Sequence, residues 1–193
     1  MSDDGAPELP RPLPTVLSAE RVLSTQLIDV DRDRIRFPDG HEAERIVVRH
    51  PGAVAIVALD EEGRWLLVRQ YRHPARRVLL EVPAGTLEPG EEPDRTAARK
   101  LREETGFAAA ELERIGGFYT APGFCDEYIH LFLARGLTAD PLPQDQDEYI
   151  EDPIALSPVA VARAAAAGEI EDAKTLSALA LLGVRGEPGA PPR

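Results

Sequence analysis

Hydrophobic residues follow two different periods along this chain, and the change between them separates expected strands from expected helices. Short apolar or alternating runs bounded by turn residues are typical of strands, whereas apolar positions three and four residues apart mark one face of a helix. The runs that predict strands are residues 15–23, 25–37, 44–50, 53–59, 65–71, 78–82, 112–119, 128–134 and 148–156. Residues 53–59 and 65–71 flank an acidic turn that ends in Gly63, so we expect them to form a hairpin.

Helices are predicted where good helix formers lie between start and stop residues. One begins at Pro93, where the missing N–H costs nothing, and stops at Gly106. Ser157 is a suitable N-cap for a second helix that runs through alanines toward Gly168, and Asp172 is a suitable N-cap for an amphipathic C-terminal helix. Strands covered by these helices indicate an α/β fold, namely an α/β/α sandwich built on a mixed sheet.

The domain organisation follows from shifts in composition along the chain. Residues 1–14 are rich in Pro, Asp and Glu and predict a disordered tail, as does the Pro- and Gly-rich segment 186–193. The amphipathic strands of residues 15–48 predict an antiparallel β arm suited to dimerisation. We expect residues 49–185 to form the main domain. No segment of the chain has the composition of a linker between two domains.

Composition and charge narrow the class of partner and the compartment. A formal net charge of −12 argues against unaided binding to nucleic acid or to an anionic membrane, since both need clustered Lys and Arg. The single cysteine, Cys125, cannot form an internal disulfide, which favours a reducing compartment. No run of eighteen apolar residues and no secretory signal is visible, so we expect a cytoplasmic protein.

Candidate chemistry gathers in residues 85–107, where a glycine-bounded loop leads into a helix with adjacent carboxylates. Lys100, Glu103 and Glu104 are three and four positions apart and so look in nearly one direction. Neighbouring carboxylates on a rigid helix beside such a loop suit an oxygen-preferring cation such as Mg²⁺, whereas an isolated pair of this kind is an ordinary solvated face. The metal hypothesis requires this acidic end of the helix to border a cavity that admits a nucleotide.

This segment resembles the Nudix box, G-x5-E-x7-R-E-U-x-E-E-x-G-U, where U is aliphatic or aromatic. The residues that match it are Gly85, Glu91, Arg99, Leu101, Glu103, Glu104, Gly106 and Phe107. One position departs, because Lys100 stands where the family has a glutamate that is a principal metal ligand. The resemblance implies the same α/β/α sandwich and a divalent cofactor, Mg²⁺ or Mn²⁺.

Outside the box, the chain resembles the ADP-ribose pyrophosphatase branch of this family over about residues 45–183. The segments that carry the likeness are VRQYRHP, LLEVPAG, TAPGF and GEIEDAKTLSALALL. The resemblance implies hydrolysis of ADP-ribose to AMP and ribose 5-phosphate by a homodimer with exchanged N-terminal strands. Another nucleoside diphosphate sugar, such as GDP-mannose or a UDP-sugar, remains an alternative substrate, since the box reports only the diphosphate.

The resemblance also assigns roles around the metal and in the frame of the box. Glu103 and Glu104 are expected to hold the metal together with the backbone carbonyl of Ala84. Arg99 is expected to pair with Glu91 and so tie the loop to the helix. Gly85 and Gly106 belong to the same structural frame.

Substrate and water contacts are expected outside the box. Arg72 of the QYR segment is expected to bind the phosphates, and Glu81 to contact substrate or metal-bound water. Arg69 is either a further phosphate contact or a solvated charge on a strand. Glu148 is the first candidate for the general base and Glu151 the second, although an acidic solvated loop accounts for both equally simply.

Lys100 changes the electrostatics of the expected metal site. A unit charge about 4 Å from another contributes roughly 4 kcal/mol at an effective dielectric constant near 20, so a glutamate-to-lysine change turns attraction into repulsion. We expect weakened Mg²⁺ binding and strongly reduced hydrolysis unless the side chain turns to solvent. The chain is then an inactivated variant of a hydrolase, a nucleotide-sugar-binding protein without catalysis, or an enzyme whose ammonium replaces one metal ion.

Overall fold

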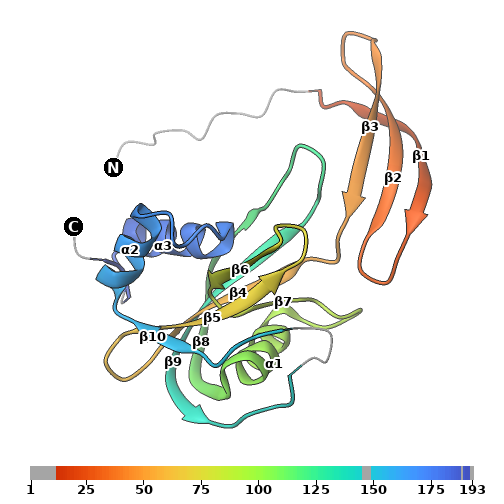
Figure 1. The fold of residues 1–193 in the computed structure, drawn as a ribbon. Coiled ribbons are helices and arrows are strands. Elements are labelled where there is room, and N and C mark those ends of the chain that lie inside the picture. The colour runs from red at the N-terminus through yellow and green to blue at the C-terminus, as the bar shows by residue number, and fades with distance from the viewer. Residues whose placement is uncertain (1–11, 145–148, 188, 192–193) are drawn as a thin grey trace. The chain divides into compact units, whose positions relative to one another are not determined.

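The computed structural model describes residues 12–144, 149–187 and 189–191 (Figure 1). Within this part, the chain forms two compact units. One contains residues 12–50 together with Ala121–Asp126, and the other contains Pro51–Thr120 together with the residues from Glu127 onward. Residues 121–126 were expected in the main domain, but they belong to the first unit, where the backbone N–H of Val48 donates to the carbonyl of Phe124 at 2.7 Å.

The first unit is an antiparallel sheet with the strand order β1-β2-β3. Its strands are β1 (Thr15–Ser24), β2 (Asp29–Arg36) and β3 (Glu42–Arg49). Arg49 connects strands to the added segment, since its guanidinium donates to Asp33 at 2.7 Å, to Asp31 at 3.0 Å and to Asp126 at 3.2 Å. Hydrogen bonds from Arg21 and Arg49 hold the pKa of Asp31 below its ordinary value. The predicted antiparallel arm is confirmed.

Every residue of β1 is exposed, including apolar residues. The exposed apolar side chains of this strand include Val16, Leu17, Val22 and Leu23. Single exposed leucines and valines are common on protein surfaces, but β1 exposes four of them within ten residues. Their side chains are therefore left largely uncovered by the unit.

The second unit is built on a mixed sheet with the order β10-β5-β4-β9-β8, in which β6 pairs with β5 and β7 pairs with β4. Its strands are β4 (Ala53–Leu59), β5 (Trp65–Arg72), β6 (Arg77–Glu81), β7 (Ala84–Thr86), β8 (Phe107–Tyr119), β9 (Tyr128–Ala139) and β10 (Ile154–Leu156). The central pair β4 and β9 is parallel, with Ala55 opposite Leu131, and the predicted hairpin of β4 with β5 is present.

Helices cover both faces of this sheet, so the predicted sandwich is confirmed (Figure 1). The helices are α1 (Pro93–Thr105), α2 (Pro158–Ala166) and α3 (Ala173–Arg185). Successive residues of a strand point to opposite faces. Ile56 of β4 therefore packs with Leu101 of α1, whereas its neighbour Val57 belongs to the core that includes Leu182 of α3.

Two stretches near the C-terminus differ from expectation. Of the strand predicted for residues 148–156, the described residues 149–156 form only β10 and one bridge between Ile150 and Gln70. Pro153, which lacks an N–H, directly precedes β10. The segment predicted to be a disordered tail contributes Gly189, whose carbonyl accepts a hydrogen bond from the buried Trp65 Nε1 at 2.8 Å. A buried indole N–H needs an acceptor, which gives this segment a reason to dock.

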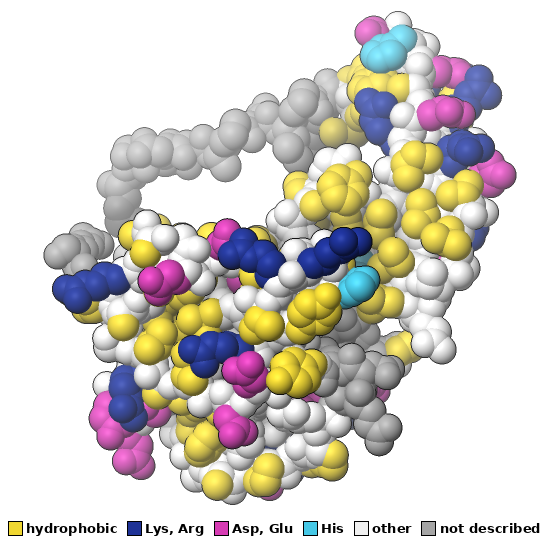
Figure 2. Space-filling view, in the orientation of Figure 1, with side chains coloured by type: hydrophobic (Ala, Val, Ile, Leu, Met, Phe, Trp, Pro, Cys, Tyr) yellow, Lys and Arg dark blue, Asp and Glu magenta, His cyan; other side chains and the backbone are white. Residues whose placement is uncertain are grey.

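On the face shown in Figure 2, Lys and Arg side chains lie among Asp and Glu side chains and do not gather into one basic surface. In the described part of the chain, no helix combines the length and the apolar character needed to cross a membrane.

Candidate active site

The box helix α1 has the boundaries that its terminal residues dictate. Pro93 occupies its first turn, and Gly106 ends it in the left-handed conformation (φ 79°), with its N–H donating to the carbonyl of Arg102 at 3.1 Å. The N-cap residue, Glu92, makes no side-chain capping bond. The glycine stop places Phe107 directly at the start of β8, so the helix and the sheet are joined without a loop.

Arg99 ties the box loop to the helix through two carboxylates. Its Nη2 and Nε donate to Glu91 at 2.7 and 3.1 Å, and its Nη1 lies 3.3 Å from Glu103. The pairing of Arg99 with Glu91 has the geometry that the family resemblance implied. The hydrogen bonds from Arg99 lower the pKa of Glu91 to about 2, so this ion pair persists across the neutral and mildly acidic range.

Lys100 and Glu104 face strand β7 and are both buried, with 5% and 2% of their surface exposed. The Lys100 ammonium lies 3.2 Å from Glu103 Oε2. Glu104 accepts a hydrogen bond from the backbone N–H of Ala84 at 3.1 Å. The aliphatic stem of Lys100 passes so close to Gly85 that a Cβ there would lie 2.5 Å from its Cδ.

Lys100 and Glu104 are therefore packed against β7, whereas Glu103 keeps 14% of its side chain exposed. A pocket of about 310 Å³ is lined in part by the β7 residues that they contact. Its lining includes Ala84, Gly85 and Thr86, but none of the α1 side chains.

The donor set does not fit the divalent site predicted from Ala84, Glu103 and Glu104. Among the residues that the structure describes, no group of three His, Cys, Asp or Glu side chains is arranged to hold a metal ion. The Glu103 carboxylate instead binds the guanidinium of Arg99 and the ammonium of Lys100. A fixed positive charge thus lies among the carboxylates at the position where the family pattern has a glutamate.

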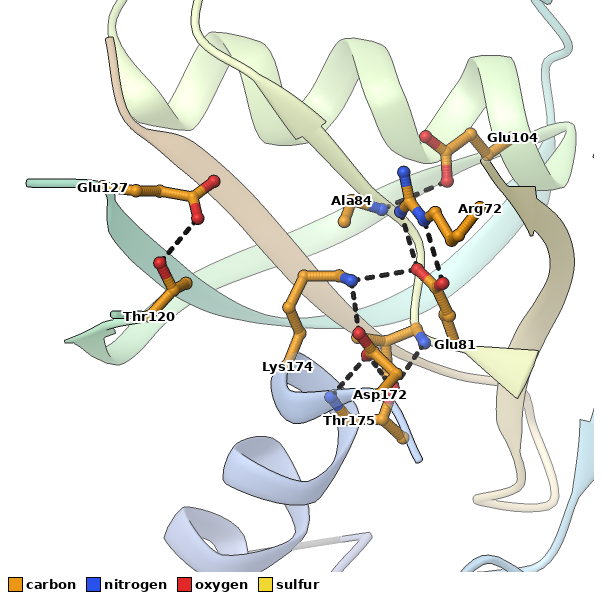
Figure 3. A network of polar contacts seen from close by, with 10 residues as sticks. Arg72, Glu81, Ala84, Glu104, Thr120, Glu127, Asp172, Lys174 and Thr175 are labelled. Atoms are coloured by element: carbon orange, nitrogen blue, oxygen red, sulfur yellow. Dashed lines mark hydrogen bonds and ion pairs between the residues drawn. The ribbon is translucent and has the colours of Figure 1, made fainter. Parts of the chain in front are cut away.

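Arg72, Asp172 and Lys174 of the pocket lining belong to a compact network of charges (Figure 3). Arg72 binds the buried Glu81 through two hydrogen bonds of 2.9 and 2.6 Å. Lys174 reaches the same carboxylate at 2.9 Å and also binds Asp172 at 2.5 Å. Burial alone would lower the pKa of Arg72, but the bonds to Glu81 outweigh it, and the pKa is raised.

Asp172 holds this network against the end of β6. As the N-cap of α3, its second carboxylate oxygen accepts from the backbone N–H of Thr175 at 2.9 Å and from the Thr175 hydroxyl at 2.7 Å. The Thr175 hydroxyl oxygen in turn accepts from the N–H of Val82 at 2.9 Å. The start of α3 is therefore fixed to the residue that follows Glu81.

The remaining predicted residues lie at different distances from this pocket. Arg72 lines it, whereas Arg69 is exposed on β5 and has its Nη1 3.9 Å from a Glu151 oxygen. Glu148, the first candidate for the general base, lies outside the described residues. Glu151 is exposed, and its N–H donates to the carbonyl of Arg69 at 3.0 Å. Neither Arg69 nor Glu151 lines the pocket.

Some lining residues were not singled out from the sequence. Lys174 lies two residues after the expected cap Asp172 and lines the pocket. Its contact with Glu81 of the LLEV segment joins residues far apart in the chain, so sequence spacing could not predict it. Thr120 and Glu127 also line the pocket and are joined by a 2.7 Å hydrogen bond from the threonine hydroxyl. Their position after β8 and before β9 was the available signal, because functional residues often follow strand ends.

Comparison with known proteins identifies the frame in which these residues lie. The family model for the NUDIX domain matches residues 49–179. This chain belongs to the NUDIX family. The Nudix chain is 44% identical to the ADP-ribose pyrophosphatase of Bacillus subtilis (strain 168) over 137 residues. The aligned residues are 70% of this chain and 74% of that protein.

Further similarities support the same assignment. The ADP-ribose pyrophosphatase of Mycobacterium tuberculosis (strain ATCC 25618 / H37Rv) is 40% identical over 170 residues, or 87% of this chain and 80% of that protein. A crystal structure of an ADP compounds hydrolase superposes with a TM-score of 0.76 at 25% identity, covering 90% of this chain and 96% of the other. The Nudix chain is accordingly an enzyme of the hydrolase class, as its box predicted.

Proposed function

We propose that this Nudix chain hydrolyses the diphosphate of ADP-ribose to AMP and ribose 5-phosphate, and that Lys100 slows the reaction. One observation carries the proposal: Arg72 and Lys174 line a pocket that β7 of the box also lines, and the buried Glu81 binds both cations. A diphosphate is the anionic group that such a wall favours. The names of the relatives from B. subtilis and M. tuberculosis support ADP-ribose as the first substrate to test.

In the proposed reaction, a water oxygen forms a bond to one phosphorus and the bridging P–O bond breaks. Arg72 offsets the negative charge that grows on the phosphate oxygens, and its planar guanidinium suits that geometry. The proton of the attacking water passes to a carboxylate, for which Glu148 remains the first candidate and Glu151 the second. A general base must reach that water within hydrogen-bond distance, and substitution of each residue by glutamine tests the assignment.

The Lys100 side chain gives the physical reason for a slow reaction. The side chain is buried beside Glu103, so it does not turn to solvent and water does not screen its charge. A unit charge of the wrong sign within about 4 Å costs roughly 4 kcal/mol at an effective dielectric constant near 20. We therefore propose Mg²⁺, with Mn²⁺ as the alternative, as the cofactor of the Lys100→Glu form.

The test compares AMP release from ADP-ribose by this chain and by Lys100→Glu, each with and without Mg²⁺. We expect the Lys100→Glu form to be at least about a hundredfold faster with Mg²⁺, since a factor of ten corresponds to only about 1.4 kcal/mol. Arg95→Glu makes the same charge change at an exposed position of α1 and should not raise the rate. Equal rates for the parent chain and the Lys100→Glu form contradict the proposal that Lys100 slows the reaction. If neither form hydrolyses ADP-ribose, the proposed substrate is wrong.

A panel of sugar nucleotides completes this test. GDP-mannose and a UDP-sugar are the alternatives, because the wall of the pocket recognises a diphosphate and not a base. If the Lys100→Glu form hydrolyses one of these faster than ADP-ribose, the proposed substrate changes and the proposed type of reaction stays the same.

The ion pair between Lys100 and Glu103 favours a second candidate function, a nucleotide-sugar-binding protein without catalysis. Calorimetry with ADP-ribose separates the two, since binding without turnover supports this candidate. We also propose a cytoplasmic homodimer joined through the arm of residues 15–48. The exposed apolar residues of β1 support the dimer, and the single cysteine supports a reducing compartment.

A further inference from the structure

Lys100 places a permanent cation inside the box, where solvent scarcely reaches it. The side chain is buried, and its ammonium lies 3.2 Å from Glu103 Oε2. Lysines commonly bury the aliphatic stem and leave the ammonium in water, but here the charge is enclosed as well. The stem carbons from Cγ to Cε all lie along Gly85. The packing of α1 against β7 therefore holds this charge in one place.

Lys100 brings the charges of the box close to balance. Arg99 and Lys100 supply two positive charges, and they bind the carboxylates of Glu91 and Glu103. A third carboxylate, that of Glu104, is buried on the same helix. These five side chains thus carry one formal negative charge in excess. Without Lys100 the excess would be two negative charges, which is the charge that one divalent cation offsets.

The groups around Lys100 are donors that suit a hard cation once the lysine is removed. Glu103 and Glu104 lie three and four residues after Lys100, so all three share one face of α1. Ala84 and Gly85 of β7 border the same space, since their backbone contacts Glu104 and Lys100. Mg²⁺ keeps several waters and is commonly held by one or two carboxylates, and Mn²⁺ prefers the same oxygen donors. The lysine stem occupies the room that such an ion and its waters would need.

We propose that Lys100 is a tethered counter-cation that takes the structural place of a divalent ion in the box. The contact of α1 with β7 is then complete without metal, and truncation of the lysine opens a divalent-cation site beside Glu103. This inference goes beyond the proposed function, because it concerns what holds the box together and needs no substrate.

A lysine that only fills the space over Gly85 makes different predictions. Lys100→Met keeps a stem of similar length and removes the charge. If the stem alone matters, this variant should be as stable as the parent. If the charge matters, the variant should be less stable, because Glu103 loses a partner in a largely buried position. Arg95→Met is the matched control, since it removes the same charge from an exposed position of the same helix.

The first measurement is thermal unfolding of the full chain in a chelator and in Mn²⁺ or Mg²⁺, with the ionic strength matched by NaCl. We expect the same midpoint for the parent in all solutions. Lys100→Ala should unfold at a lower temperature in the chelator and gain at least about 3 °C once Mn²⁺ exceeds its dissociation constant tenfold. Lys100→Met should be less stable than the parent and gain less from Mn²⁺ than Lys100→Ala, because its stem still fills the space. Arg95→Met should respond like the parent.

The second measurement is Mn²⁺ binding followed by electron paramagnetic resonance, without any substrate. Lys100→Ala should bind Mn²⁺ at least about tenfold more tightly than the parent, since loss of one unit charge at this distance from a divalent ion outweighs a factor of ten. If Lys100→Ala does not fold, Lys100→Gln, which is neutral and shorter than lysine, replaces it in both measurements.

Each outcome either upholds or overturns the inference. An equal effect of Mn²⁺ on the parent and on Lys100→Ala overturns it, and so does equal stability of Lys100→Met and the parent in the chelator. Mn²⁺ binding by Lys100→Ala, combined with no hydrolysis of ADP-ribose by the parent or by Lys100→Glu, upholds the counter-cation and rejects the proposed function. Hydrolysis by Lys100→Glu without a Mn²⁺ effect on Lys100→Ala has the opposite meaning.

Discussion

The stem of Lys100 lies directly over Gly85, at a distance that leaves no room for a side chain at the glycine. Gly85 belongs to the short strand β7, where it pairs with Val54 of β4. The lysine thus occupies the space between the box helix and the loop, and its ammonium reaches Glu103. The replacement at position 100 is consequently part of the packing of this site as well as of its charge.

Gly85→Ala should destabilise the chain, because the added methyl group would lie 2.5 Å from Lys100 Cδ and would force a shift. Overpacking of this kind costs about 1–3 kcal/mol. In the Lys100→Ala background the space is open, and the same substitution should cost much less. Urea unfolding of the two single variants and the double variant measures this coupling. Additive costs would show that the contact with Lys100 is not the cause.

Thr175→Val should destabilise the junction of α3 with β6. The variant keeps the shape of the side chain but leaves the N–H of Val82 without the hydroxyl oxygen that accepts from it at 2.9 Å. An unsatisfied buried donor costs about 1–3 kcal/mol. Thr175→Ser keeps the hydroxyl and should lose less. The midpoint of thermal unfolding orders the three forms, and a serine variant as unstable as the valine variant would contradict this explanation.

The ion pair between Glu91 and Arg99 should make stability depend on pH in the acidic range. The pKa of Glu91 is about 2 in the folded chain, below its ordinary value of 4.5, because Arg99 donates hydrogen bonds to it. A lowered folded pKa contributes stability that is complete above pH 4.5 and is lost as the pH falls through about 2. Glu91→Gln should therefore be less stable at neutral pH, and its deficit should shrink on acidification. Urea unfolding of both forms across that range tests this, and a constant deficit would count against it.

Removal of the residues after Gly186 should loosen the core around Trp65. Its indole N–H donates to the Gly189 carbonyl, and Ala190 packs against the same core. Losing the acceptor of a buried donor costs about 1–3 kcal/mol, and water can then reach the ring. Trp65 is the single tryptophan, so its fluorescence reports this site alone. A red shift of its emission is expected, and unchanged emission with unchanged thermal stability would show that the segment contributes nothing.

The chain should form a dimer through the arm. Exposed apolar residues on β1, such as Val16 and Val22, favour a partner surface. Light scattering should give twice the mass of one chain. Replacing Val16 and Val22 by serine should shift the mass toward that of one chain, whereas serine at the still more exposed Val184 of α3 should not. A monomeric parent chain would contradict the prediction.

Local chemistry alone determined most of the elements of this protein. Pro93 and Gly106 bound the box helix because one lacks an N–H and the other tolerates a left-handed backbone, and both effects act within one turn. Asp172 caps α3 for an equally local reason. The apolar run of residues 53–59 gave the central strand, and the spacing of the Nudix box gave the family.

The tertiary structure decided which of these side chains meet. Arg72 and Lys174 are about a hundred residues apart in the chain, and only the packing of α3 against the end of β6 brings both to Glu81. Burial decided the surroundings of Lys100 and Glu104 in the same way, because β7 packs against α1 and both side chains are buried there. Sequence spacing fixes the direction of a side chain on its own helix, but what lies in that direction depends on contacts between distant segments.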